Sequence, residues 1–217
     1  MVRARPQLSR DPLDGEFESL MMRVQCLLWD FGDTLCDELS LWRTSPEWME
    51  VYRSFDEKDG IGAAWSLGDL DTHEVAEKLA ERMTLSEAEI HAHLSRTDLF
   101  DFFPFTYAFF RARHLPQAIV TVNPAQFRAM AQDLAFDEVT DAIVVSAEEK
   151  TIDKGALCEI ALQRIPIGCP NARALLIDNK QSNIDAWARR GGIGYRYTTD
   201  SAFRQDVAAG IDGLVRP

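Results

Sequence analysis

Two aspartates in this sequence directly follow hydrophobic runs. Asp30 ends LLWD within LLWDFGDTLCDE, and Asp178 ends LLID within LLIDNKQSNIDAW. Thr121 lies near the end of a third run, AIVTVN, and Lys154 follows a fourth. Two carboxylates can hold a hard cation such as Mg²⁺, and one of them can act as a nucleophile. A hydroxyl and an ammonium group can neutralise the oxygens of a phosphoryl group, so these four residues form a candidate chemical site.

Short hydrophobic runs must position these residues. The runs are 24–29, 117–122, 142–145, 173–177 and 193–197. They are almost continuously apolar, which is typical of strands covered on both faces of a parallel sheet. Stretches with helical periodicity follow the last four runs, at 124–134, 154–164, 181–190 and 200–208. This alternation predicts an α/β fold with a Rossmann-like parallel sheet, in which polar groups at the carboxyl ends of the strands meet at one edge.

The chain between the first two predicted strands is too long for a simple crossover. Residues 38–115 contain helix starts at Ser45-Pro46-Glu47, at Asp71 or Thr72, and at Thr84 or Ser86. We therefore expect an inserted helical cap domain over the edge of the sheet. The aromatic run 100–110 is expected to pack between the cap and its hinge, with an apolar wall for the substrate as the alternative.

The rest of the chain is expected to form the α/β core, from residues 21–37 and 116–217. Residues 1–20 are polar and irregular. They predict a flexible N-terminal arm, or an extension upstream of a start at Met21 or Met22.

Composition limits the partners of the protein. The formal net charge is −12, which repels nucleic acid, and the basic residues form no patch. The four cysteines lack metal-ligand spacing, which favours reduced thiols in a cytoplasmic protein. The sequence also has no apolar stretch of membrane-spanning length. We expect a small-molecule substrate and no nucleic-acid or membrane partner; the sequence gives no indication of oligomeric state.

The motifs and their order resemble the haloacid dehalogenase-like (HAD) superfamily over about residues 23–208. LLWDFGDTL is similar to the first motif of that superfamily, AIVTVN to the second and LLIDNKQSNIDAW to the fourth. The insert resembles a C1-type cap. The third motif usually places a lysine before a proline, and this sequence has no Lys-Pro pair. Lys154, at the start of a predicted helix, is the preferred counterpart, and Lys150 is the alternative.

The resemblance implies a role for each matching residue. The implied catalytic residues are the nucleophile Asp30, with Thr121 and Lys154 holding the transferred group. The implied ligands of Mg²⁺ are Asp30, the backbone carbonyl of Gly32, Asp178 and Asn179. The remaining residues, expected to bind substrate, are Asp33, Thr34, Asn123 and Lys150.

One position departs from the pattern of HAD phosphatases. Those enzymes usually carry an aspartate two residues after the nucleophile, and general acid–base help of this kind is typically worth about 10²–10⁴-fold. Here that position is Gly32, and Asp33 would point to the opposite face of an extended chain.

Three interpretations follow from this departure. The first is a Mg²⁺-dependent phosphatase that acts on a small phosphate monoester through an aspartyl intermediate, with weak activity or with Asp33 or a cap residue as substitute acid. The second is a dehalogenase-type or phosphonatase-type hydrolase. The third is a non-catalytic binding protein with the same fold. The pairing of Asp30 with Asp178 favours the first.

Overall fold

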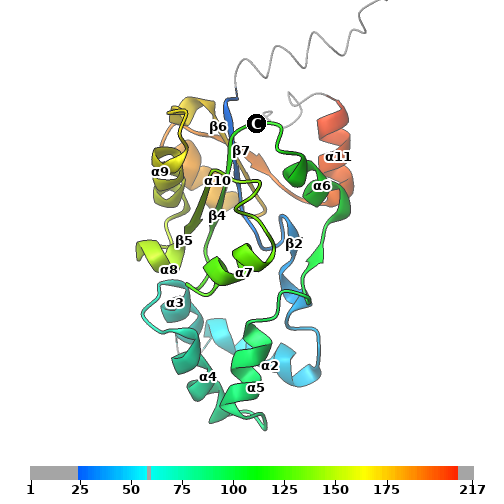
Figure 1. Ribbon diagram of the computed structural model, residues 1–217, viewed down its shortest axis with the longest axis vertical. Coiled ribbons are helices and arrows are strands. Elements are labelled where there is room, and N and C mark those ends of the chain that lie inside the picture. The colour runs from blue at the N-terminus through cyan, green and yellow to red at the C-terminus, as the bar shows by residue number, and fades with distance from the viewer. Residues whose placement is uncertain (1–23, 58–59, 210–217) are drawn as a thin grey trace, which may run out of the picture.

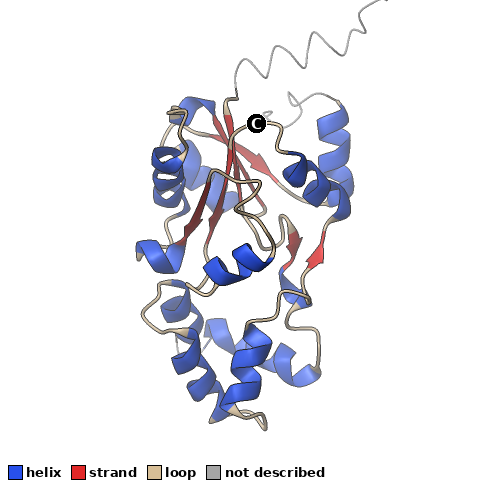
Figure 2. Ribbon diagram, viewed as in Figure 1, coloured by secondary structure: helices blue, strands red, loops and turns tan. Residues whose placement is uncertain are grey.

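The computed structural model of the chain describes residues 24–57 and 60–209. Its main sheet has the strand order β5-β4-β1-β6-β7, and every neighbouring pair is parallel (Figure 2). The strands are β1 (Cys26–Trp29), β4 (Gln117–Thr121), β5 (Ala142–Val145), β6 (Ala174–Asp178) and β7 (Ile193–Arg196). All five coincide with the predicted hydrophobic runs, which confirms the α/β class. The predicted N-terminal arm, residues 1–20, lies outside the described residues.

Helices cover both faces of the sheet (Figure 1). Two of them, α9 (Lys154–Arg164) and α10 (Gln181–Ala188), bury Leu157 and Trp187 with Cys26 and Leu28 on one face. The opposite face is covered by α6 (Pro104–Ala112), α7 (Phe127–Asp133) and α11 (Asp200–Ala208). Short elements complete the core: α8 (Ser146–Glu149) and the 3-10 turn η2 (Asn171–Arg173).

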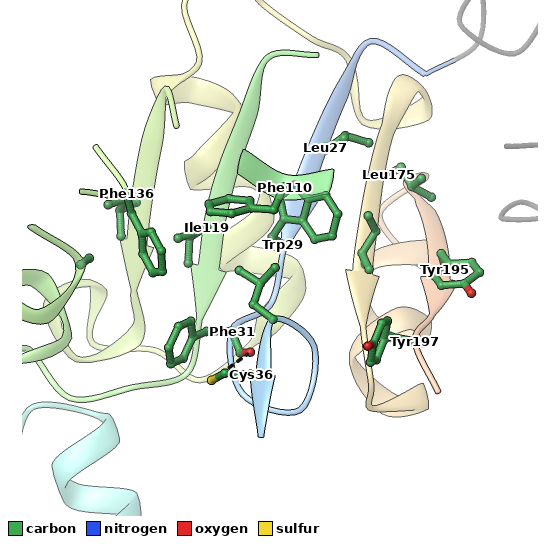
Figure 3. Packing of buried hydrophobic residues seen from close by; sticks show 14 of the residues in the cluster. Leu27, Trp29, Phe31, Cys36, Phe110, Ile119, Phe136, Leu175, Tyr195 and Tyr197 are labelled. Carbon is green, nitrogen blue, oxygen red and sulfur yellow. Dashed lines mark hydrogen bonds between the residues drawn. The ribbon is translucent and has the colours of Figure 1, made fainter. Parts of the chain in front are cut away.

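The face of the sheet under α6, α7 and α11 is rich in aromatic side chains. Along β1, Cys26 and Leu28 point to the face under α9 and α10, whereas Leu27 and Trp29 point to this aromatic face, where Phe110 packs beside Trp29 (Figure 3). Gln117 lies among these apolar residues and is fully buried. Its side chain accepts a hydrogen bond from Trp29 Nε1 at 3.0 Å and donates to Phe110 O at 2.8 Å and to Val139 O at 2.9 Å. These bonds join β4, β1 and α6.

The inserted helices form a separate layer below the sheet in Figure 1. They are α2 (Pro46–Glu57), α3 (Ile61–Ser66), α4 (Thr72–Ala80) and α5 (Glu87–Leu94). Their buried side chains share one cluster, which includes Trp42, Trp48 and Trp65. Asp71 and Ser86 form capping boxes at the starts of α4 and α5, at two of the predicted cap positions. The 3-10 turn η1 (Glu38–Ser40) leads the chain from the core into this layer.

The aromatic run 100–110 packs on the core. Strand β3 (Asp101–Phe102) pairs antiparallel with β2 (Cys36–Asp37) in a small second sheet. Helix α6 then packs against α11, and Phe110 is fully buried in the core cluster. The buried cluster of the inserted helices ends at Leu94, so the chain has returned to the core before the predicted boundary at residue 115.

The four cysteines are buried and form no disulfide among the described residues. No helix among the described residues is long and apolar enough to span a membrane.

Candidate active site

Three residues far apart in the sequence meet at the carboxyl edge of the sheet. Asp30 directly follows β1, Asp178 ends β6, and Lys154 begins α9. Lys154 Nζ lies 2.7 Å from Asp30 Oδ1 and 3.2 Å from Asp178 Oδ2, and it donates a hydrogen bond to Val120 O at 2.8 Å. All three side chains are buried: Lys154 is 2% exposed, Asp30 8% and Asp178 0%. The structure therefore groups the predicted nucleophile, the predicted metal ligand and the preferred lysine.

The charges in this group do not balance. Two carboxylates share one ammonium group in a buried site. Burial raises the pKa of Asp30 most, the ammonium of Lys154 partly opposes this effect, and the charge of Asp178 adds to it; the resulting pKa is about 6. Burial alone favours the neutral amine of Lys154, but the two carboxylates outweigh it and raise the pKa of Lys154 above its usual value. The site carries excess negative charge and suits an additional cation.

Both carboxylate oxygens of Asp178 are held by helix α10 and the loop before it. Asn183 Nδ2 donates to Asp178 Oδ1 at 3.1 Å and to Oδ2 at 3.0 Å. The backbone N–H of Lys180 donates to Oδ1 at 2.8 Å. Asn183 lies five positions after Asp178 in the fourth motif, where the sequence alone left open whether it orients a metal ligand or caps the helix.

A cavity of about 440 Å³ opens beside Asp30, between the core and the inserted helices. The core contributes Asp30, Gly32, Thr121, Asn123 and Lys154 to its lining. The inserted layer contributes an apolar wall of Leu41, Trp42, Tyr52 and Trp65. Thr121 Oγ1 accepts a hydrogen bond from Asn123 Nδ2 at 2.5 Å, so these two predicted residues lie together at the end of β4. The size and mixed lining suit a small organic molecule with a polar end.

Besides Asp178, which is buried behind Asp30 and Lys154, four predicted residues lie outside the lining of this cavity. Asp33 and Asn179 line a separate hollow beside Tyr197. Asp33 has a positive φ of 54°, and its Oδ1 accepts from the backbone N–H of Glu38 at 3.0 Å. Thr34 is fully buried, and its Oγ1 has no hydrogen-bond partner among the described residues.

Lys150, the fourth of these residues, belongs to a contact between the core and the inserted helices. Its Nζ donates to Gly68 O of the inserted layer. Nearby, Ser146 Oγ donates to Ser66 O at 2.6 Å. These contacts hold α3 against α8, and they place Lys150 away from the group formed by Lys154 and Asp30.

Sequence reasoning missed one acidic residue of the cavity. Glu38 lines it together with Asp30 and Gly32, at the start of η1. The sequence feature that could have indicated Glu38 is its place at the end of LLWDFGDTLCDE, eight residues after Asp30. The aromatic wall of Trp42, Tyr52 and Trp65 was also missed, because their meeting depends on how the inserted helices pack.

The described residues contain no cluster of three or more His, Cys, Asp or Glu side chains suited to a metal ion. The predicted Mg²⁺ site is of a different kind, because it combines two carboxylates with the backbone carbonyl of Gly32 and with Asn179. Of these four, Asn179 lines the separate hollow beside Tyr197. The carboxylate donors of the predicted site, Asp30 and Asp178, are hard oxygen ligands of the type that Mg²⁺ prefers.

Comparison with solved structures identifies the fold. A HAD-family enzyme from Bacteroides thetaiotaomicron, solved with magnesium and inorganic phosphate, is 14% identical with a TM-score of 0.63, covering 81% of this chain and 95% of that chain. A predicted HAD-like family hydrolase from Porphyromonas gingivalis is 11% identical with a TM-score of 0.67, covering 86% and 97%. L-2-haloacid dehalogenase from Xanthobacter autotrophicus is 13% identical with a TM-score of 0.61, covering 89% and 85%.

Sequence comparison alone gives no match to a protein-family model and none to a curated protein. The three structural neighbours are nevertheless all HAD-family or haloacid dehalogenase enzymes, and each is covered over at least 85% of its length. The chain therefore has the fold of the haloacid dehalogenase-like hydrolases, as its motifs predicted.

Proposed function

We propose that this protein is a hydrolase that removes the phosphoryl group from a small phosphate monoester. The observation that carries the proposal is the contact of Lys154 Nζ with both Asp30 and Asp178, beside an apolar-walled cavity that Lys154 and Asp30 line. A nucleophilic carboxylate, an adjacent ammonium group and a threonine hydroxyl are what phosphoryl transfer to an aspartate requires.

The second carboxylate favours a phosphatase that uses Mg²⁺. Asp178 raises the pKa of Asp30, which opposes ionisation of the nucleophile. A bound divalent cation would reverse this effect and would offset the charge of the phosphate oxygens. Asp30, Asp178 and the carbonyl of Gly32 would hold the cation. Lys154 Nζ lies 3.2 Å from Asp178 Oδ2. A cation bound to Asp178 would weaken that contact and make the ammonium group of Lys154 available to the substrate.

In this proposal each side chain around the cavity has its own role in the reaction. Asp30 attacks phosphorus and forms an aspartyl-phosphate, while Lys154 and Thr121 hold the oxygens of the transferred group. Asn183 keeps the carboxylate of Asp178 in orientation through its two hydrogen bonds. The apolar wall formed by Trp42, Tyr52 and Trp65 excludes water and binds the organic part of the ester.

A substrate panel tests the proposal. The purified protein is assayed with p-nitrophenyl phosphate and with alkyl phosphates, in Mg²⁺ and in EDTA. We expect turnover that needs Mg²⁺ and that is lost in Asp30→Asn. The matched control is Asp37→Asn, the same change in an acid outside the cavity lining. Full activity of Asp30→Asn would overturn the mechanism.

The main alternative is a hydrolase that displaces halide from a 2-haloacid. It is favoured by the absence of a side chain at Gly32, since direct displacement of halide by a carboxylate needs no acid there, and by the apolar wall of the cavity. Halide release from 2-haloacids in EDTA, without phosphatase activity, would support this alternative.

A further inference from the structure

Gly32 and Glu38 occupy one small region of the cavity. A methyl group added to Gly32 would lie 3.2 Å from Glu38 Oε2 and 3.3 Å from both Cβ and Cδ of the same side chain. The space that an aspartate at position 32 would need is therefore already filled by the carboxylate of Glu38. The missing side chain at position 32 makes room for an acid that comes from six residues further along the chain.

The turn after β1 fixes Glu38 in this place. Asp33 adopts a left-handed conformation, with a φ of 54°, and its backbone N–H donates to Cys36 O at 2.7 Å. Asp33 Oδ1 then accepts from the backbone N–H of Glu38 at 3.0 Å. Asp37 caps η1 by accepting from the backbone N–H of Leu39 at 2.9 Å. The two neighbouring acids are thus used to shape the turn, and Glu38 is the one whose side chain lines the cavity with Asp30.

We propose that Glu38 is the general acid and base of the reaction, in place of an aspartate at position 32. This inference rests on the proposed phosphatase function and names the residue that completes it. In the first half-reaction, Asp30 attacks phosphorus, the ester P–O bond breaks, and the carboxylic acid of Glu38 gives its proton to the departing alkoxide oxygen. In the second, the Glu38 carboxylate takes a proton from water. The resulting hydroxide attacks the aspartyl-phosphate, and the P–O bond to Asp30 breaks. Glu38 ends protonated, so it is ready for the next cycle.

Leaving-group chemistry tests this role. Alkyl phosphates need protonation of their leaving oxygen, whereas p-nitrophenolate leaves without it. We expect Glu38→Gln to lower kcat for an alkyl phosphate by about 10²–10⁴-fold. With p-nitrophenyl phosphate, the first half-reaction survives and the second becomes slow. The variant should therefore release a burst of one equivalent of p-nitrophenol per enzyme, followed by slow turnover.

Two further variants complete the test. Asp37→Asn is the matched control, because Asn keeps the acceptor for Leu39 N–H, and it should retain wild-type kinetics on both substrates. The double variant Gly32→Asp with Glu38→Ala returns a carboxyl group to the same region, so it should recover activity relative to Glu38→Ala. Circular dichroism and thermal midpoints verify that each variant is folded.

The outcomes separate this inference from the proposed function. A wild-type protein without Mg²⁺-dependent phosphatase activity overturns the proposed function itself. An active wild type that depends on Asp30, together with a Glu38→Gln variant of equal activity and no burst, overturns only the role of Glu38. Asp33→Asn with the kinetics expected for Glu38→Gln would assign the acid to Asp33 instead.

Discussion

Lys154 Nζ lies 2.7 Å from Asp30 Oδ1 in a site where neither side chain is more than about one tenth exposed. Removing this ammonium group leaves Asp30 and Asp178 buried without a counter-charge. We expect Lys154→Met to lower the free energy of unfolding by about 3–5 kcal/mol at pH 8, the range for breaking a buried ion pair. Urea denaturation measures the change.

The same variant has a predictable pH dependence. The pKa of Asp30 is already raised to about 6 in the native protein, above its usual 3.8, and loss of Lys154 raises it further. Because the folded state then binds a proton more tightly than the unfolded state, stability is regained as pH falls through the folded pKa. The loss in Lys154→Met should be smaller at pH 5 than at pH 8. Lys78→Met, a change at an exposed lysine of α4, should show little loss at either pH; an equal loss in both variants would contradict the argument.

The two hydrogen bonds from Asn183 to Asp178 predict an effect on metal affinity. Residues that orient a metal ligand typically contribute about 10–100-fold to affinity. We expect Asn183→Ala to weaken Mg²⁺ binding by about tenfold or more, as measured by titration calorimetry. Gln181→Ala is the control, because it removes an exposed amide from the same helical turn. Equal Mg²⁺ affinity in the wild type and Asn183→Ala would contradict the role of Asn183 in orienting Asp178.

Helix α6 depends on a cap from a distant residue. Phe103 at its N-cap offers no side-chain hydrogen bond. Instead Asp200, at the start of α11, accepts from the backbone N–H groups of Phe105 at 3.1 Å and Thr106 at 2.7 Å. We expect Asp200→Ala to lower the free energy of unfolding by about 1 kcal/mol, and Asp200→Asn, which keeps one acceptor, by less.

The pH dependence of this cap has the opposite sign to that of Asp30. Partial burial disfavours the charged form of Asp200, but hydrogen bonds from Thr106 and Phe105 outweigh it and lower the pKa below 3.8. An acid with a lowered folded-state pKa contributes stability above its unfolded pKa and loses it as pH falls through the folded value. The difference between wild type and Asp200→Ala should be constant above pH 5 and shrink below 3.8. A difference that persists unchanged at pH 2 would show that charge plays no part in this cap.

Gln117 supports the aromatic face of the sheet. Gln117→Leu would leave Trp29 Nε1, Phe110 O and Val139 O without their present partner in a buried region. Since each unsatisfied buried group costs about 1–3 kcal/mol, we expect a loss of about 3 kcal/mol or more in urea denaturation. Gln132→Leu, on the exposed side of α7, serves as the control. A loss in Gln117→Leu no larger than in this control would contradict the expected role of the three bonds.

The sequence contained enough to predict the sheet and the residues at its edge. Strands buried on both faces appear as near-continuous hydrophobic runs, so β1, β4 and β6 could be placed together with the polar residue that follows or ends each one. The lysine was harder to assign, because Lys150 and Lys154 lie within one helical turn of each other in sequence. Only the fold shows that Lys154 points to Asp30 and Lys150 to Gly68.

Other features depend on contacts that no local pattern encodes. Helix α6 has four aromatic residues among its nine, and its cap comes from Asp200, nearly one hundred residues later. The position of Glu38 depends on the left-handed turn at Asp33, a conformation that a non-glycine residue seldom adopts.

Strand β1 is hydrogen-bonded to β4 on one side and to β6 on the other, and all four of its residues are buried. Each of its amide protons is bonded to one neighbouring ladder and lies in the buried centre of the sheet, so we expect exchange there to need a large opening of the core. Hydrogen exchange at Leu27–Trp29 should report the global free energy of unfolding, whereas the exposed turns of the inserted helices should exchange sooner. Asp30 thus directly follows the central strand of the sheet, so opening of an edge strand alone does not release it.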